Sequence, residues 1–398
     1  MKIDRVEIKN FKSLKDINIE LNNLTLLTGI NSTGKSSFIQ ALLLMKQNEK
    51  YFNIVSSRIA LKKLSDLSKK NGFSFSDDSY LEIKSLELNR EYIKLGDIKT
   101  ILYQDSFKED ILLRLYYHKK NISISFSEIN IRYDIDIITN DEKIVIEELI
   151  KNDVNIFNNF QYIMTDRVAP QISYGLSEKD IKKNLIGHSG EYTAHYLAVN
   201  KNKILEIEKL RHKESKTNQF LENVSLWLGE ISNGIDISSE VYQDMQLAKL
   251  TYQYTYGKRK SNNYSPLNVG FGVTYVLPII VSILKAKLGD LLIIENPESH
   301  LHPAGQSKIA ELCSIAAANG VQIIVETHSD HFLNGLRVAT KKGIIKPKES
   351  NIYYFRKEIN SLETKIDKLN VDKYGNINDW PDGFFDEWDK KLDDLLGI

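Results

Sequence analysis

The sequence has one cysteine, no excess of either charge and no apolar run long enough to cross a bilayer. Cys313 alone cannot form a disulfide within the chain, which excludes a disulfide framework and favours a reducing compartment. The longest apolar stretch, residues 273–284, is too short for a membrane span and contains Pro278. The first residues, MKIDRVEIKNFKSL, have no signal-peptide core, so we expect a cytoplasmic protein with no membrane partner.

Charge and composition describe a globular chain. The 53 basic residues balance 53 acidic ones, so any contact with nucleic acid would need a local patch. The 398 residues, 42% hydrophobic and 27% charged, suffice for two or three lobes, each with its own core. The chain has no repeats, low-complexity tracts or sustained heptads, so long coiled-coil arms are not expected.

Hydrophobic periodicity predicts the elements of the first two thirds of the chain. Strands are predicted at residues 3–11, 15–21 and 23–29, and a helix follows at residues 36–46. The strand-rich stretch of roughly residues 80–150 is predicted to contain strands at 80–89, 91–96, 111–118, 121–126 and 129–138. A helical pattern then covers about 178–240, with helices at 190–211 and 218–232, before residues 246–260 return to strand.

The last third alternates apolar strands with helices. A loop feeds a buried helix within residues 269–288, and strands at 290–296 and 321–329 flank a helix at 303–320 that Gly320 ends. Near-continuous apolar strands of this kind predict a parallel sheet covered on both faces. The expected fold is α/β, with a mixed or parallel core sheet, an antiparallel β lobe and a short helical lobe. The expected segments are 1–50, 51–177, 178–263, 264–345 and 346–398.

A phosphate-binding motif lies between the third strand and the first helix. Residues 29–36, GINSTGKS, fit G-x-x-x-x-G-K-[ST] in the strand–loop–helix context that this motif requires. The glycines let consecutive N–H groups turn inward around phosphates, and the helix presents the positive end of its dipole. Lys35 would reach the β- and γ-phosphates, and the Ser36 hydroxyl would bind Mg²⁺.

Polar residues follow two later strands. Glu295 ends LLIIE, and His328 follows the strand that ends in VET. Open α/β sheets bind ligands at the carboxyl ends of their strands, so both residues are candidates for the same nucleotide pocket. Hydrolysis needs a carboxylate for the metal and a group that orients water.

Three segments together resemble one family. LTGINSTGKSS, LLIIENPESHLHP and VETHSDHFLNGLR resemble the Walker A, Walker B and switch-histidine segments of ATP-binding-cassette heads of the RecF, SMC and OLD kind. The likeness covers roughly residues 1–50 and 264–398 and says less about the middle. The tail NINDWPDGFFDEWDKKL resembles the ending of one bacterial branch of these ATPases.

The resemblance implies roles for individual residues. Glu295 stands where the metal-binding aspartate usually stands, and Asn296 stands where a catalytic glutamate would be. Because an amide cannot accept a proton from water, Glu298 is the alternative base, or hydrolysis is slow. His328 matches the histidine that senses the γ-phosphate. The cofactors are ATP and Mg²⁺, and the nucleotide is expected to contact Asn31, Ser32, Thr33, Gly34, Lys35, Ser36 and Ser37.

The family also implies a dimer. SPLNVGFGVTYVLP lies where such heads carry their signature loop, although it lacks the usual serine-glycine-glycine core. Gly270 and Gly272, just before a helix, suit contact with the γ-phosphate on a second head. The segment ESHLHPAGQ would lie at the dimer seam. Gln47 is a weak match to the glutamine that links the metal site to the other lobe.

The roles of several residues have more than one interpretation. Arg167 either touches phosphate or closes an ion pair, and YGKRKSNNY (256–264) is either a solvated hairpin tip or a nucleic-acid contact. The histidines suggest a dimer-seam or nucleotide role more than zinc: His300, His302, His328 and His331. The acidic tail fits a solvated helix face better than a nuclease centre, with Phe384, Phe385, Trp388 and Leu392 buried, and a partner-binding role for it stays open.

The sequence thus predicts an Mg²⁺-dependent ATPase that dimerises around ATP and gates a separate effector or nuclease. A role in bacterial antiphage defence rests on family analogy alone. The alternatives are a nucleotide-locked scaffold, which Asn296 favours, and a DNA-repair clamp of the RecF type. Dimers could also be units of a larger oligomer.

Overall fold

The structure is a computed structural model that describes residues 2–70, 85–106, 110–118, 120–137, 156–157, 159–358, 360–378, 380–381 and 383–397. Two compact units emerge from its internal contacts. The first comprises Met1–Leu21, Asn31–Asn158 and Phe355–Lys365, and the second comprises Asn22–Ile30, Asn159–Tyr354 and Ile366–Ile398. The five-segment division made from the sequence stays a prediction.

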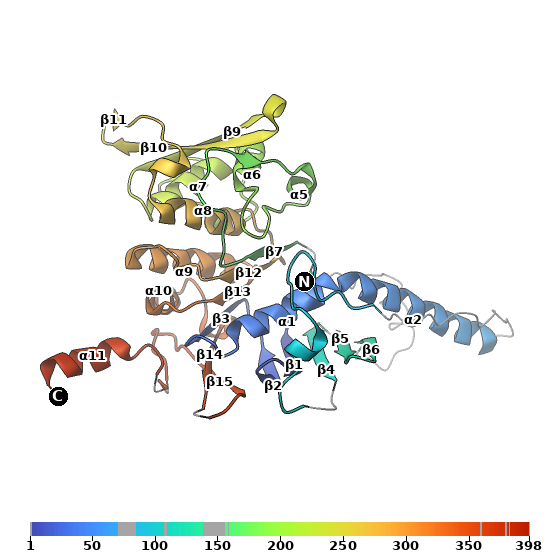
Figure 1. Ribbon diagram of the computed structural model, residues 1–398. Coiled ribbons are helices and arrows are strands. Elements are labelled where there is room, and N and C mark those ends of the chain that lie inside the picture. Colours follow the sequence, from blue (N-terminus) through green and yellow to red (C-terminus); the bar gives the residue numbers. More distant parts are fainter. Residues whose placement is uncertain are drawn as a thin grey trace. The chain divides into compact units, whose positions relative to one another are not determined.

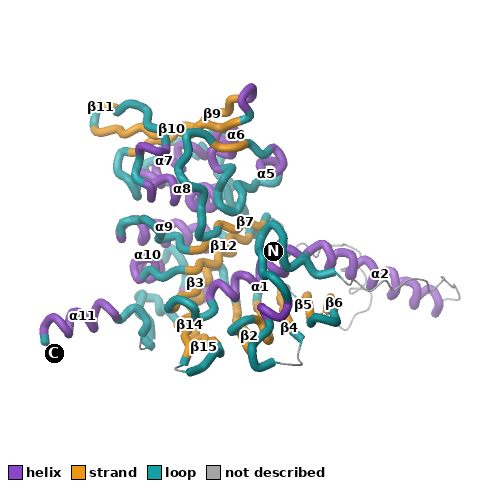
Figure 2. Tube along the Cα trace, in the orientation of Figure 1, coloured by secondary structure: helices purple, strands orange, loops and turns teal. Residues whose placement is uncertain are grey.

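The first unit contains a five-stranded antiparallel sheet in the order β2-β1-β4-β5-β6. Its strands are β1 (Arg5–Phe11), β2 (Leu14–Glu20), β4 (Ile111–Tyr117), β5 (Lys120–Phe126) and β6 (Ile131–Ile137). Buried and partly exposed residues alternate along β1 and β4, as expected for a sheet with one covered face. Among the described residues of this unit, the helices, purple in Figure 2, are α1 (Lys35–Gln47), α2 (Glu49–Lys70) and α3 (Ile98–Ile101).

The second unit is built on a sheet in the order β15-β14-β3-β13-β12-β7. The strands β3 (Leu24–Gly29), β13 (Gln322–Glu326), β12 (Leu291–Glu295) and β7 (Phe160–Ile163) are parallel neighbours. Each is almost wholly buried, which is typical of a sheet covered on both faces. The sheet also contains β14 (Ser350–Lys357), beside β3, and the edge strand β15 (Thr364–Leu369), and part of each strand belongs to the first unit.

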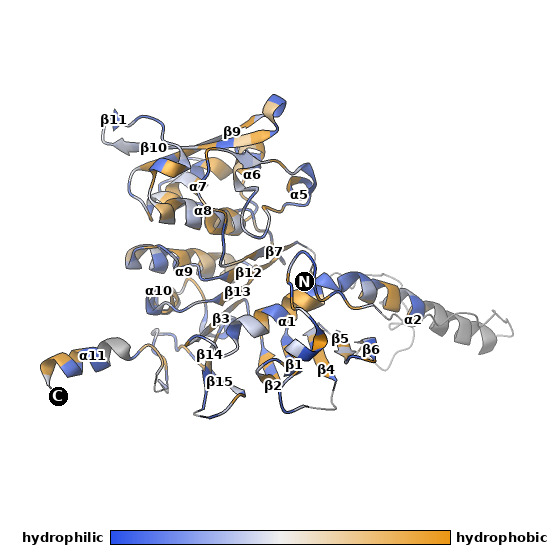
Figure 3. Ribbon diagram, viewed as in Figure 1, coloured by the Kyte–Doolittle hydropathy of each residue, from blue (hydrophilic) through white to orange (hydrophobic). Residues whose placement is uncertain are grey.

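Helices cover this sheet. The second unit holds α8 (Phe271–Leu284), α9 (Pro303–Ala318) and α10 (Asp330–Lys341), and α9 packs along α10 (Figure 1). From residue 273 onward α8 is buried on all sides, and Figure 3 shows its apolar colouring. The remaining helix of the tail is α11 (Glu387–Leu396). The described helices include none that combines the length and apolarity needed to cross a membrane.

A small antiparallel sheet completes the second unit. It contains β8 (Tyr174–Gly175), β9 (Ile235–Tyr242), β10 (Leu247–Tyr256) and β11 (Arg259–Lys260). Three helices belong to the same region: α5 (Glu178–Lys182), α6 (Thr193–Asn200) and α7 (Phe220–Gly229). Short 3-10 turns occur at η1 (Glu208–Leu210), η2 (Gln243–Met245), η3 (Pro266–Asn268) and η4 (Pro347–Glu349).

The predicted fold class is confirmed, and no long coiled coil occurs within the described ranges. Several element predictions were wrong. The helical pattern predicted to about residue 240 ends earlier, because the alternating buried and exposed residues from Ile235 onward form β9, which pairs with β10. Residues 201–211 and 218–219 are not helical apart from η1, because Leu205, Ile207 and Leu210 turn inward from irregular backbone. Residues 85–89 and 91–96 form no strands and make only the isolated bridge between Asn89 and Lys94, and the prediction for 80–84 falls outside the described residues.

The tail is only partly as expected. Phe384 is buried and Phe385 is half-buried, whereas Leu392 is exposed, because α11 does not lie with its apolar stripe against the head. The Trp388 side chain is outside the described set. The sequence therefore located the anchoring residues but overestimated how far the helix docks.

Candidate nucleotide-binding site

Three parallel strands bring the candidate segments to one edge of the sheet. Leu27 of β3 is paired with Glu326 of β13, which in turn is paired with Glu295 of β12. The main chain continues this alignment, since the Thr327 N–H donates to the Leu27 carbonyl (3.0 Å) and the Asn296 N–H donates to the Glu326 carbonyl (2.8 Å). The start of the phosphate loop, the acidic end of β12 and the loop after β13 therefore leave the sheet at the same edge.

The phosphate loop itself enters α1 in the geometry that the motif requires. Gly34 is the N-cap residue at φ 104°, and a Cβ there would lie 2.5 Å from the Thr364 hydroxyl oxygen. That hydroxyl donates to the Thr33 carbonyl (2.8 Å) and thereby fixes the loop. Because glycine offers no capping side chain, the first-turn amides of α1 remain suited to an anion. Lys35 and Thr33 are buried, Ser37 is half-buried, and the loop exposes Asn31, Ser32 and Ser36.

Glu295 is a largely buried carboxylate held from the loop after β7. The Thr165 hydroxyl donates to its Oε2 (3.0 Å), and the Thr165 N–H approaches the same oxygen (3.3 Å). Burial raises the pKa of Glu295, and hydrogen bonds from Thr165 and Tyr162 act in the opposite direction. A carboxylate that is costly to keep charged gains most from a cation beside it, which suits a metal ligand.

Arg167 fixes the main chain of the same strand end. Its two terminal nitrogens donate to the carbonyls of Glu295 (2.9 Å) and Asn296 (2.8 Å). The guanidinium carbon also lies 4.4 Å from the ring centroid of Tyr275 in α8. Burial lowers the pKa of Arg167 to about 10, so the group stays charged at neutral pH. The observed contacts of this residue are thus carbonyls and a ring, a use that neither sequence reading considered.

Glu298 is tied to the neighbouring strand end. Its Oε2 accepts from the Thr327 hydroxyl (2.7 Å), and its Oε1 accepts from the His328 N–H (2.8 Å). The His328 side chain is exposed. The carboxylate is therefore bonded to the loop that carries the candidate γ-phosphate sensor, and each oxygen has a further lone pair for a water molecule.

Asn296 has a backbone reason to be asparagine. Its φ is 45°, in the left-handed region where asparagine and aspartate are tolerated far better than larger side chains. The amide oxygen lies 3.5 Å from the Thr165 hydroxyl, at the outer limit of a hydrogen bond. A glutamate at this position would be strained, so the departure from the family pattern follows from local geometry.

The glycines of the signature-like loop open α8. Gly270 is its exposed N-cap residue, and Gly272 is required by a close approach, since a Cβ would lie 2.3 Å from the His300 carbonyl oxygen. The ring of His300 packs edge-on against Phe271 (4.7 Å between centroids) and Tyr275 (5.0 Å). The Tyr275 hydroxyl donates to the Thr165 carbonyl (2.6 Å). The start of α8 is thus connected through Tyr275 to the residues that hold Glu295.

Gln47 has a different environment. Its amide nitrogen donates to the Glu87 carbonyl (2.7 Å), and its oxygen accepts from the N–H groups of Tyr92 (3.2 Å) and Ile93 (3.3 Å). These bonds fasten residues 87–93 to the end of α1. Gln47 as a metal ligand stays a prediction, but its oxygen already has two donors.

The other histidines have local structural contacts. His302 caps α9 by accepting from the Ala304 N–H (3.3 Å), and His331 lies 3.7 Å from the Asp330 carboxylate. Within the described part of the chain, no three His, Cys, Asp or Glu side chains gather as a metal site. Sequence reasoning did not single out Thr165, Tyr275 and Thr327. Tyr275 and Thr327 nevertheless lie within the signature-like and switch-histidine segments, and Thr165 lies two residues before Arg167.

Comparisons with known proteins identify the family and the fold. The chain belongs to the AAA ATPase domain family, which it matches over residues 1–333. Residues 345–395 match a second family, described as a protein of unknown function (DUF3696). No curated protein matches the chain.

Among solved structures, an SMC head bound to the C-winged helix domain of ScpA aligns with a TM-score of 0.50 at 15% identity, covering 94% of this chain and 99% of that chain. An SMC head from Thermotoga maritima (TM-score 0.44, 10% identity, 93% and 100% coverage) also aligns. So does the Smc head domain from Pyrococcus furiosus, with an extended coiled coil and bound to the C-terminal domain of ScpA (0.43, 13%, 99% and 99%). The first alignment identifies the fold as that of an SMC head, and the family identifies an ATP-binding domain of the ATPase class.

Proposed function

We propose that this chain is an Mg²⁺-dependent ATPase whose nucleotide-driven dimerisation gates a separate partner protein. ATP binds to residues 31–37, Ser36 and Glu295 ligate Mg²⁺, Glu298 orients and deprotonates the attacking water, and His328 senses the γ-phosphate. The observation that carries this proposal is the aligned edge of β3, β13 and β12, from which all these segments depart. The family match supports nucleotide binding independently.

Two features support a dimer closed by ATP. Gly270 is the exposed N-cap residue of the 14-residue helix α8. The N–H groups of the first turn of α8 are therefore suited to contact a phosphate that is bound to a second head. The contacts from Tyr275 to the Thr165 carbonyl and to Arg167 give a route by which engagement of α8 reaches the Glu295 strand end. Since the aligned SMC head is bound to a domain of ScpA, a separate protein partner is the natural analogy. Antiphage defence, with an effector encoded separately, extends that analogy.

Phosphate release by purified protein tests the enzymatic part. Lys35→Ala should abolish Mg²⁺-dependent release from ATP, because the motif lysine is the direct cation for the β- and γ-phosphates. Lys348→Ala is the matched control. Lys348 is exposed, and the substitution keeps its main-chain carbonyl, which accepts from Asn22, so the variant should release phosphate at the parental rate. Turnover that is independent of Lys35 would refute the proposal.

A slow-turnover scaffold is the second candidate, and Asn296 favours it because its amide is not a base. Sedimentation velocity separates the two candidates. A scaffold would form an ATP-dependent dimer whose lifetime far exceeds the turnover time of an ordinary ATPase. An enzyme would lose the dimer as ATP is consumed. The two outcomes separate the candidates in one experiment.

The hairpin β10–β11 favours a nucleic-acid clamp as a third candidate. Tyr254 and Tyr256 stack with their planes 2° apart, and Lys258, Arg259 and Lys260 are exposed beside them. Stacked rings beside basic side chains suit nucleic acid. Binding to DNA that falls steeply with salt, and that Arg259→Ala and Lys260→Ala weaken, would support the clamp. Binding that salt does not change would remove it.

A further inference from the structure

Two contacts join the C-terminal part of the chain to the start of α1. Residues 345–395, which lie outside the AAA ATPase match, contain β14 and β15. Phe355 of β14 packs edge-on against Phe38 in the first turn of α1 (6.3 Å between ring centroids), and both rings are fully buried. Thr364, the first residue of β15, is buried as well and contacts the phosphate loop itself. The segment matched by the second family therefore reaches the nucleotide motif through a ring and through a hydroxyl.

The Thr364 hydroxyl is held in place from the turn between β1 and β2. The Thr364 N–H donates to the Ser13 carbonyl (2.9 Å), and the hydroxyl oxygens of the two residues lie 2.8 Å apart. The Thr364 hydroxyl donates to the Thr33 carbonyl (2.8 Å). A Cβ at Gly34 would lie 2.5 Å from the Thr364 hydroxyl oxygen and 3.0 Å from that of Ser13, so glycine is what allows the loop to approach this pair.

The bond to the Thr33 carbonyl also sets the direction of the next N–H. The peptide between Thr33 and Gly34 is trans, and in a planar trans peptide the C=O and the N–H point in opposite directions. Because the carbonyl points to Thr364, the Gly34 N–H points away from Thr364. Phosphate loops bind anions through N–H groups that face the ligand, so a rotation of this peptide would replace a donor by a carbonyl oxygen.

We propose that Thr364 is a positioning residue for the phosphate loop, which makes the segment matched by the second family a part of the nucleotide site. By holding the Thr33 carbonyl, Thr364 keeps the Gly34 N–H directed at the bound phosphates. The inference rests on the proposed binding of ATP to residues 31–37 and adds a contributor 331 positions after Thr33. Thr364 acts on the loop and on no metal ligand, so its contribution to ATP affinity is independent of Mg²⁺.

Calorimetric titration with ATP measures this contribution. Thr364→Val keeps the shape of the side chain and removes the donor, so ATP should bind about tenfold more weakly, equally with Mg²⁺ and with a chelator. Thr364→Ser keeps the hydroxyl and loses a buried methyl group, so it should bind ATP as the parent does while its urea midpoint falls. A residue with a purely structural role would instead give affinities that follow the stabilities of the variants.

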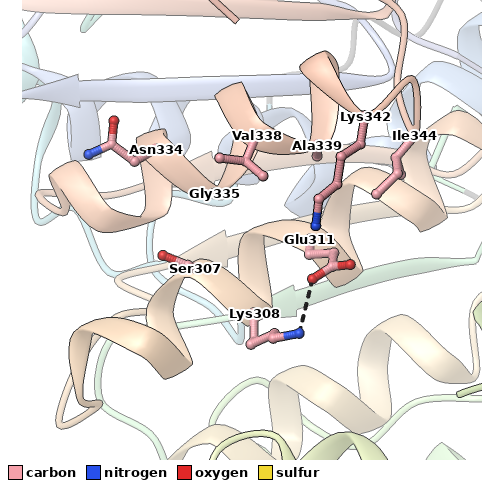
Figure 4. A pocket seen from close by; sticks show the side chains of 9 residues that line it. All are labelled: Ser307, Lys308, Glu311, Asn334, Gly335, Val338, Ala339, Lys342 and Ile344. Atoms are coloured by element: carbon pink, nitrogen blue, oxygen red, sulfur yellow. Dashed lines mark ion pairs between the residues drawn. The ribbon is translucent and has the colours of Figure 1, made fainter. Parts of the chain in front are cut away.

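Thr340→Val is the matched control. The buried Thr340 hydroxyl also donates to a main-chain carbonyl, that of Leu336 (3.0 Å), but this bond lies within α10. The preceding residues Val338 and Ala339 line a groove of about 240 Å³ against α9 (Figure 4). The control therefore removes a comparable hydrogen bond without touching the phosphate loop, and its ATP affinity should equal that of the parent.

Hydrogen exchange of the nucleotide-free protein gives a second readout. The amides of residues 34–37 should exchange several-fold faster in Thr364→Val than in the parent, in Thr364→Ser or in Thr340→Val. Unchanged exchange, or a Thr364→Val protein that binds ATP as tightly as the parent, would overturn this inference and leave the proposed function standing. A parent protein that binds no ATP would refute the proposed function and this inference together.

Discussion

Glu295 and Glu298 lie three residues apart after one strand, yet their surroundings differ in kind. Glu295 is buried, its pKa is raised by burial, and its side chain and main chain are held by Thr165 and Arg167. Glu298 is instead bound by Thr327 and His328, whose loop follows a different strand. The first setting suits the proposed metal ligand, whereas the second would couple the proposed base to the proposed γ-phosphate sensor. Position after the strand alone would not have separated these roles.

The largest effect on kcat is expected at Glu298, the residue proposed as the base. Glu298→Gln should lower kcat by about 10²- to 10⁴-fold, because an amide cannot take the proton from water. Asn296→Asp should change kcat little, since aspartate tolerates the same left-handed backbone. Phosphate release at saturating Mg²⁺-ATP measures both.

Two controls sharpen this result. Thr327→Val removes one of the two hydrogen bonds to Glu298, together with the acceptor of the Ser329 N–H, and should cost a few-fold. Glu240→Gln on the exposed side of β9 should cost nothing. If Thr327→Val matched Glu298→Gln, the carboxylate would act by positioning the loop. If Asn296→Asp had the larger effect, the assignment of the base would be wrong.

A smaller effect, on stability, is expected at Arg167, which holds the main chain at the end of the Glu295 strand. Arg167→Met leaves the carbonyls of Met164, Glu295 and Asn296 without this charged donor, so the free energy of unfolding should fall by about 2–4 kcal/mol. Arg167→Lys keeps the charge but not the forked geometry and should recover part of this loss. Urea denaturation measures the stability. An Arg167→Met protein as stable as the parent would show that the strand end does not need this clamp.

The smallest effect concerns Lys285, a buried ionisable group at the other end of α8, away from the strand edge. Burial lowers its pKa from 10.5 to about 7, and its ammonium donates to the Asn184 carbonyl (2.6 Å). Between pH 7 and 10.5 the unfolded chain binds the proton and the folded chain does not, so stability should rise with pH. From pH 7 to 9 the gain should be about 2 kcal/mol.

Lys285→Met provides the control for that prediction. Methionine retains most of the apolar side chain and cannot titrate, so the rise in urea midpoint between pH 7 and 9 should disappear. An unchanged rise in the variant would assign the pH dependence to other groups. This comparison shows how a buried charge behaves when no ligand site surrounds it.

Much of the fold could be predicted from the hydrophobic periodicity of the sequence and from the phosphate-loop motif. The apolar runs that became β3, β12 and β13 and the strand–loop–helix context of the phosphate loop were predictable, because near-continuous burial leaves a strong pattern. The antiparallel strands β4 to β6 followed from alternation. The irregular segment between α6 and α7 could not be predicted. Its apolar residues have the spacing of a helix, but tertiary contacts bury them in irregular backbone.

The site was predictable as a set of motifs but not as a set of contacts. Glu295 and Glu298 were recognised from their place after a strand. The roles of Thr165, Arg167 and Tyr275 depend on residues more than 100 positions apart that meet only after folding. Asn296 was interpreted as a lost base, whereas its backbone angle supplies a physical reason for asparagine.

The central claim is that the loop after β3 and the acidic end of β12 act on one Mg²⁺-ATP. Calorimetric titration with ATP, in the presence of Mg²⁺ and in the presence of a chelator, tests it most directly. Lys35→Ala should lose binding in both conditions. Glu295→Gln should bind metal-free ATP as the parent does but lose the gain in affinity that Mg²⁺ provides. A Glu295→Gln protein that keeps the full Mg²⁺ effect would contradict the account.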